Sequence, residues 1–172
     1  MNNFVLNSIR FVLFVLFQVL ILNNVEPGLG LYIMIYPLFI FMLPFQMGTV
    51  PLMLLSFAFG LVIDSFSNTF GLHASSAVVM AFFRPIIFKW LSPRDGYENV
   101  ESISVYSMGG RWFLYAYGTL ILIHHTWFFT IESFKLNEFL WILLKIGLSA
   151  PSSFLLSLLV QFIFISNKKA VR

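Results

Sequence analysis

A few ionisable side chains lie inside long apolar stretches, and these are the residues that could do chemistry in this chain. The clearest are Arg10, Asp64, Arg84 and Lys145. A charged group within a membrane segment is costly and usually contacts protein or water, so each is a candidate for an ion pair, a proton relay or a substrate contact. The long side chains of Arg10 and Arg84 could instead reach an interface and act only as anchors.

The three histidines are the other candidates, because histidine is the usual residue for proton transfer and metal binding. His124 and His125 are adjacent, so on a helix they point about 100° apart and cannot easily ligate one ion. The third is His73. The sequence has no cysteine, no His-Glu-x-x-His, no phosphate-binding glycine loop and no Gly-x-Ser-x-Gly. We therefore predict no enzymatic activity and no catalytic, cofactor-binding or metal-binding residues.

The composition indicates that membrane helices must position these groups. Hydrophobic residues make up 59% of the 172 residues and charged residues 10%, where a soluble domain would carry roughly a quarter charged residues. This apolar excess is more than one core of this size can bury, so the surplus must face lipid. The net charge of +3 is scattered rather than gathered in a basic patch, and we predict no nucleic-acid partner.

Charged residues are so rare that their positions divide the chain into membrane-length segments. A spanning helix needs about 20 residues, and the uncharged stretch from Pro27 to Ile63 is long enough for two short spans. Pro44 and Pro51 place a turn between them because proline interrupts helical hydrogen bonding. We predict an all-α integral membrane protein, a single domain of six transmembrane helices. The expected helices are about 4–23, 29–45, 49–64, 72–91, 111–131 and 138–166, with a cytoplasmic loop at about 92–110.

Lysine and arginine gather on one side of this arrangement. If the N-terminus is inside, the outer loops receive only Lys135. The cytoplasmic side then receives Lys89, Arg94, Arg111, Lys168, Lys169 and Arg172. By the positive-inside rule, both termini are expected in the cytoplasm. The middle of the cytoplasmic loop, 97–108, either forms a short interfacial helix or stays irregular, and the loop serves as a connector or as a docking site for a partner.

Small and polar residues recur at four-residue spacing on two of the predicted helices. The third helix carries Ser56, Gly60 and Asp64, and the sixth carries Lys145, Ser149, Ser153, Ser157 and Gln161. Small side chains let membrane helices approach closely. One hypothesis is that the two stripes pack together and that Asp64 pairs with Lys145. The alternative is that Asp64 caps the fourth helix or lies in interfacial water, while Lys145 extends to the outer interface.

A short motif joins the third and fourth predicted helices. The third helix ends in Gly-x-x-x-Asp, a polar loop follows, and a glycine and a hydrophobic residue open the next helix. The matching residues are Gly60, Asp64, Gly71 and Leu72. In this motif the chain resembles the rod shape-determining protein MreD family. The length, the six-span layout, the proline-interrupted second helix and the basic tail also agree, so the resemblance covers essentially the whole chain, apart from a fairly long 92–110 loop.

This resemblance implies a multi-pass protein of the bacterial inner (cytoplasmic) membrane that acts in cell shape and lateral peptidoglycan synthesis. The partners it implies are membrane lipid, an MreC-like single-span protein and, directly or indirectly, a RodA-type glycosyltransferase with its transpeptidase and MreB filaments. It also implies a fold similar to the substrate-binding membrane subunits of energy-coupling-factor transporters. We expect a non-enzymatic scaffold of the elongation complex. The alternative is a transport subunit with a polar pocket formed by Asn68, His73, Asp64 and Lys145.

Overall fold

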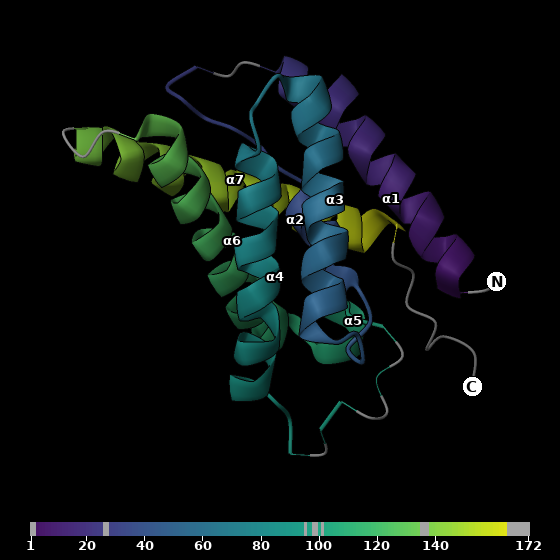
Figure 1. The fold of residues 1–172 in the computed structure, drawn as a ribbon. Helices are drawn as coiled ribbons and strands as arrows, with labels where there is room; N and C mark the ends of the chain where they lie inside the picture. The colour runs from purple at the N-terminus through teal and green to yellow at the C-terminus, as the bar shows by residue number, and fades with distance from the viewer. Residues whose placement is uncertain are drawn as a thin grey trace.

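A computed structural model describes residues 3–25, 28–94, 96–97, 100, 102–134 and 138–164. This part of the chain is helical and contains no strand, which confirms the all-α prediction for it (Figure 1). The helices are α1 (Asn3–Leu20), η1 (Leu22–Asn24), α2 (Tyr36–Met42), α3 (Thr49–Ser67), α4 (Leu72–Trp90), α5 (Val105–Met108), α6 (Gly110–Ser133) and α7 (Phe139–Phe164). Five of the six predicted helices therefore exist, with ends within about three residues of those expected.

Four segments are long and apolar enough to cross a membrane: Asn7–Asn24, Thr49–Ser67, Leu72–Trp90 and Phe139–Phe164. Much of their outer surface is aliphatic or aromatic, as expected for contact with lipid. Leu20, for example, is 64% exposed on α1 and Leu54 is 64% exposed on α3. These features are those of a membrane protein.

The second predicted helix, at 29–45, is helical only in the seven residues of α2. Pro37 opens this helix, where its missing N–H is not needed. Pro44 ends it, because the residue before a proline is pushed out of the helical region, and Leu43 has ψ of 152°. Residues 31–35 have no regular structure. We call residues 31–43 the broken segment. Every residue from 34 to 41 is buried, so this segment passes through the centre of the molecule.

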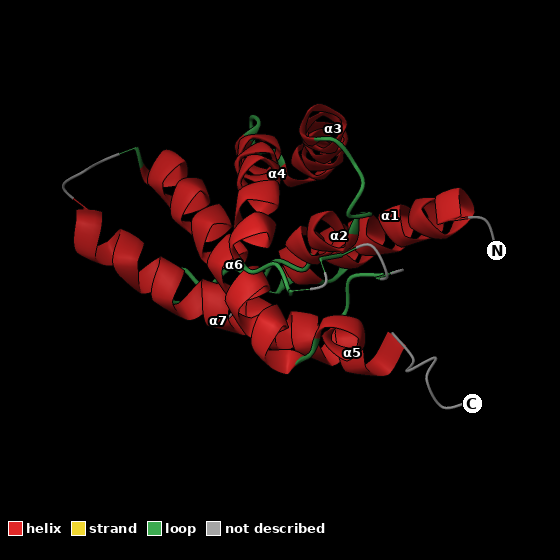
Figure 2. Cartoon of the chain, turned by 90° about the horizontal axis from the view of Figure 1, so that it is seen from below, coloured by secondary structure: helices red, strands yellow, loops and turns green. Residues whose placement is uncertain are grey.

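The helices pack around α2 in a simple order. The antiparallel helices α3 and α4 lie side by side (Figure 1), α4 packs on α6, and α6 packs on α7. Helix α1 packs on α3. Figure 2 shows α2 in the middle of the bundle, where it contacts α1, α4 and α6. Aromatic rings fill the surrounding core, with Phe39 against Phe59 at 4.7 Å and Phe41 against Tyr117 at 4.9 Å between ring centroids.

The 92–110 loop contains a short helix, α5, which spans only four residues. Ser104 caps it through a reciprocal pair of hydrogen bonds with Ser107. Among the residues of 92–109 that the structure describes, only the four of α5 are helical. Several charges on which the expected orientation depends lie outside the described residues, namely Lys135, Lys168, Lys169 and Arg172.

Candidate functional site

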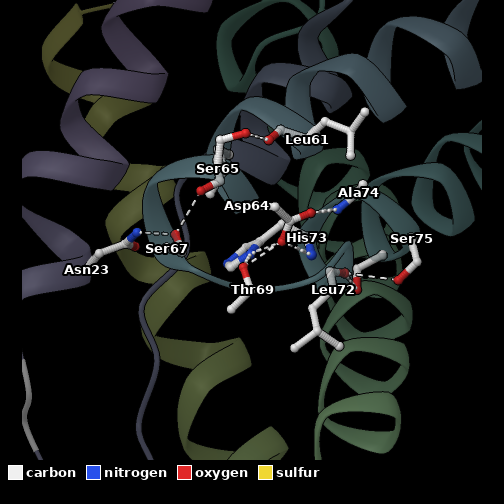
Figure 3. A network of polar contacts seen from close by, with 12 residues as sticks. Asn23, Leu61, Asp64, Ser65, Ser67, Thr69, Leu72, His73, Ala74 and Ser75 are labelled. Carbon is white, nitrogen blue, oxygen red and sulfur yellow. Dashed lines mark hydrogen bonds and ion pairs between the residues drawn. The ribbon is translucent and has the colours of Figure 1, made fainter.

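The carboxylate of Asp64 lies at the junction of α3 and α4 and caps the start of α4 (Figure 3). Its Oδ1 accepts hydrogen bonds from the Thr69 hydroxyl at 2.6 Å and from the His73 backbone N–H at 3.1 Å. The His73 ring adds a third at 3.0 Å. Its Oδ2 accepts from the backbone N–H of Ala74 at 2.9 Å. An anionic acceptor is favoured there, because the first N–H groups of a helix have no partner within it. The prediction that Asp64 caps the fourth helix is confirmed.

Gly60 lets the two helices come close enough for this cap. A Cβ atom at Gly60 would lie 2.4 Å from Cα and 2.6 Å from N of Ala74, and these are backbone atoms that cannot turn aside. The turn between the helices uses left-handed conformations at Asn68 (φ 55°) and Gly71 (φ 84°), which favour asparagine and glycine. Leu72 then opens α4 and packs against the core. The four motif residues therefore build one tight corner.

The predicted ion pair between Asp64 and Lys145 is wrong. The Lys145 ammonium instead lies 2.8 Å from a carboxylate oxygen of Glu132, with both side chains partly buried. The reason is the packing order, because α7 lies against α6, which carries Glu132, whereas α3 lies against α4 and α1. The predicted packing of the two small-residue stripes is wrong for the same reason.

The serine stripe of α7 faces the broken central segment. Ser149 Oγ accepts a hydrogen bond from Tyr32 N at 3.0 Å, and Ser153 Oγ accepts one from Met34 N at 2.9 Å. Buried backbone groups outside regular structure need such partners from the protein, because an unpaired polar group away from water is costly. These two serines are therefore polar contacts, as predicted, but the groups that they serve belong to residues 31–35.

Gln18 on α1 completes this arrangement from the other side of the segment. Its amide oxygen accepts from Ile35 N at 2.8 Å, and its amide nitrogen donates to Ile33 O at 3.2 Å. The side chain is 2% exposed. Our sequence analysis missed this residue, although it is the one polar residue in the apolar run from Phe11 to Leu22. A single polar residue in an apolar run could have identified Gln18 from the sequence.

Two of the three histidines, His73 and His124, contact Tyr36 in the core, and His125 lies against His124. The Tyr36 hydroxyl hydrogen-bonds His124 Nε2, and the Tyr36 ring lies 5.6 Å from that of His73 between centroids. His125 Nδ1 bonds the carbonyl of Ile121 at 2.9 Å and must donate to it, so Nε2 is left to accept from Ser153 at 3.1 Å. This assignment makes His125 a neutral link between α6 and α7. Among the described residues, no group of three His, Asp or Glu side chains could hold a metal ion.

Two further residues of the predicted set have different surroundings. Ser157 shares a 2.8 Å hydrogen bond with the Tyr117 hydroxyl and so joins α7 to α6. Ser56 is fully buried, but its hydroxyl has no hydrogen-bond partner. Its side chain is therefore a small buried group on α3 that makes no hydrogen bond.

The Arg84 side chain turns into the protein, where it contacts the end of α2. Its Nε donates to the carbonyl of Phe41 at 3.1 Å, and its Nη2 donates to that of Leu43. The side chain is 2% exposed. A cation is favourable at these carbonyls because they form the negative end of α2. Arg84 thus bonds carbonyls at the C-terminal end of the broken segment, as the serines and Gln18 bond backbone groups at residues 32–35.

Comparison with protein-family models, with curated proteins and with solved structures finds no match. The resemblance to the MreD family therefore stays a prediction, carried by the motif from Gly60 to Leu72. The predicted likeness to the membrane subunits of energy-coupling-factor transporters also stays a prediction. The roles given above to individual side chains depend only on their geometry.

Proposed function

We propose that the chain is a non-enzymatic scaffold subunit of the bacterial cell-wall elongation complex, involved in cell shape and lateral peptidoglycan synthesis. The observation that supports this most directly is that the Asp64 carboxylate accepts hydrogen bonds from four donors, one in the turn before α4 and three at the start of α4. An acid bound in this way is a structural cap. The motif that resembles the MreD family thus builds a rigid corner, which is what a scaffold requires.

The outer faces of the helices are the surfaces that this proposal assigns to partners. The small-residue stripes of α3 and α7 are used for contacts inside the chain, as Gly60 and Ser153 illustrate. Large apolar side chains remain exposed on both helices, among them Leu54, Phe57, Leu155 and Leu159. In a membrane such faces contact lipid or the helices of other proteins. The proposed partners are an MreC-like single-span protein and, directly or indirectly, the RodA-type glycosyltransferase with its transpeptidase and MreB.

The proposal includes six crossings of the cytoplasmic membrane, with both termini inside. The crossings would be α1, the segment at 31–43, α3, α4, α6 and α7. The buried polar partners of the second crossing support it, because non-helical backbone is tolerated at membrane depth only when protein surrounds it. Lys89 lies near the end of α4, Arg111 lies near the start of α6, and Arg94 lies in the 92–110 loop that joins them, which supports a cytoplasmic position for that loop.

The alternative, a substrate-binding transport subunit, needs a shared polar pocket on the outer side. Asp64 and His73 bond each other, whereas Lys145 bonds Glu132 on α6. These side chains are therefore engaged in separate structural contacts, which favours the scaffold over the transporter.

The test is purification of the tagged chain in mild detergent, followed by identification of the membrane proteins that remain bound. We expect a single-span partner. Paired alanine substitutions on exposed faces would then locate the interface, with Leu54 and Phe57 on α3 compared with Leu155 and Leu159 on α7. Both pairs are exposed, so either variant should fold, and one of them should lose the partner.

Two results would contradict the proposal. One is a chain that purifies without any membrane-protein partner but gains thermal stability from a soluble small molecule, as a transport subunit should. The other is an unchanged cell shape in a rod-shaped host after the protein is depleted.

A further inference from the structure

An open cleft of about 470 Å³ lies where the C-terminal end of α4 meets the turn after α2 and the 92–110 loop. Arg84 and Lys89 supply the charge in its lining, and Gln46 and Ser92 supply neutral polar groups. Phe88 and Tyr97 are among its apolar walls. The cleft thus combines two cations with aromatic rings, and no carboxylate is among the described residues that line it.

Arg84 is the unusual member of this lining, because the part of the chain that the structure describes offers no counter-ion for its charge. Its two hydrogen bonds go to the neutral carbonyls of Phe41 and Leu43. The guanidinium has five N–H donors, so these bonds leave others for a ligand. No ion pair joins it to a carboxylate within the described ranges, although its side chain is 2% exposed. A buried charge is normally paired.

The aromatic wall is held rigidly beside this charge. The guanidinium carbon of Arg84 lies 4.7 Å from the centroid of the Phe88 ring. Tyr97 stacks on Phe45 at 4.4 Å, and its hydroxyl donates to the carbonyl of Phe88 at 2.7 Å. Burial raises the pKa of this hydroxyl, and a hydrogen bond from Trp112 partly offsets the rise. Tyr97 is therefore neutral at physiological pH and adds no negative charge.

We propose that this cleft binds a phosphate group, held between Arg84 and Lys89. A guanidinium presents paired donors that match phosphate oxygens, and an ammonium adds a second positive charge. Basic pockets between membrane helices bind the phosphates of anionic lipids. The apolar walls favour a lipid headgroup whose acyl chains continue along the helices, and a soluble phosphate would use the same two cations. The site is independent of the proposed scaffold function.

The test measures thermal unfolding of the purified chain in mild detergent. Three additions are compared: phosphatidylglycerol, phosphatidylcholine with the same acyl chains, and inorganic phosphate. We expect phosphatidylglycerol to raise the melting temperature in a saturable way, because a ligand that binds only the folded state stabilises it. Phosphatidylcholine should have little effect. If inorganic phosphate gives the full effect and the lipid adds nothing, the site is confirmed and its ligand is a soluble phosphate.

The variants leave Arg84 intact, because it also supports α2. Lys89→Gln removes the second cation, and we expect the apparent Kd for phosphatidylglycerol to rise about fivefold. Gln46→Glu places a negative charge in the lining and should weaken binding at least as much. Arg111→Gln is the matched control, since Arg111 is an exposed cation that does not line the cleft, and its apparent Kd should change by less than about twofold. Equal stabilisation by both lipids, or equal weakening by Lys89→Gln and Arg111→Gln, would overturn the proposal.

Discussion

Two regions of the molecule satisfy their backbone hydrogen-bonding groups in different ways. One is the corner between α3 and α4, and the other is the broken segment at 31–43. Both contain backbone groups that lack a partner in a helix, and both bury them away from water. At the corner, the acceptor Asp64 is at most ten positions from its donors along the chain. In the broken segment, the Met34 N–H bonds a serine 119 positions away, and the Ile35 N–H bonds a glutamine 17 positions away.

This difference decides what each region contributes. The corner is a local unit in which glycine spacing, turn residues and a capping acid agree with one another. The broken segment depends on α1, α4 and α7, because each of these helices supplies some of its hydrogen-bond partners. We therefore expect substitutions at the corner to disturb the pairing of two helices, and substitutions around the segment to loosen the centre of the bundle. The predictions below test this contrast.

The largest effect is expected for Gly60→Ala. The added Cβ would lie 2.4 Å from the Ala74 backbone, so α3 and α4 must separate and Asp64 must lose its cap geometry. We expect the free energy of unfolding to fall by about 3 kcal/mol. Thermal unfolding in detergent would measure it. Gly147→Ala on α7 is the matched control, because a Cβ there meets nothing within 4 Å. Equal melting temperatures for the two variants would show that the corner is not close-packed.

Asp64→Ala removes the acceptor but leaves the close approach of the helices intact. Four donors lose their partner, and we expect a loss of about 2 kcal/mol, as for a strong helix cap. Ser65→Ala is the neighbouring control, since its hydroxyl bonds only Leu61 O of its own helix. If Asp64→Ala and Ser65→Ala had the same small effect on thermal unfolding, the corner would be held by packing alone.

Ser153→Ala tests the broken segment in the same way. The change leaves the buried Met34 N–H without its acceptor and His125 without its donor, and we expect a loss of about 1 kcal/mol. The adjacent Ser152 is the control, because its hydroxyl bonds only Leu148 O within α7. Hydrogen exchange of the Met34 amide should accelerate in the Ser153 variant only. An unchanged exchange rate would mean that the amide has another partner.

The smallest effect is expected at the ion pair between Lys145 and Glu132. Both side chains are partly exposed, at 13% and 23%, so the pair is expected to contribute at most about 1 kcal/mol. A double-mutant cycle of Lys145→Gln with Glu132→Gln would measure this coupling. The same cycle between Lys145→Gln and Asp64→Asn should give no coupling. A measurable coupling with Asp64 would contradict the separation of the two residues.

The sequence predicted the parts of this protein that depend on near neighbours. The composition and the spacing of charged residues predicted apolar helices, and the predicted ends of five helices are close to the observed ends. The stripe of Ser56, Gly60 and Asp64 predicted a close helix approach, but with the sixth predicted helix rather than with α4. The cap formed by Asp64 was one of two alternatives that the sequence left open. Proline positions also predicted an interruption after the second segment. They did not predict how short its helix would be, because a buried apolar run gives the same pattern whether it is helical or extended.

The tertiary structure decided which polar side chains meet. A four-residue stripe tells which face of α7 is polar, but the partner of that face depends on how helices far apart in the sequence are arranged. Lys145 therefore forms an ion pair with Glu132 rather than with Asp64. Ser153 accepts a hydrogen bond from the backbone of Met34 rather than packing against α3. The physical reason is that a bilayer offers no water to buried N–H and C=O groups, so the packing that satisfies all of them together is selected over any single attractive pair.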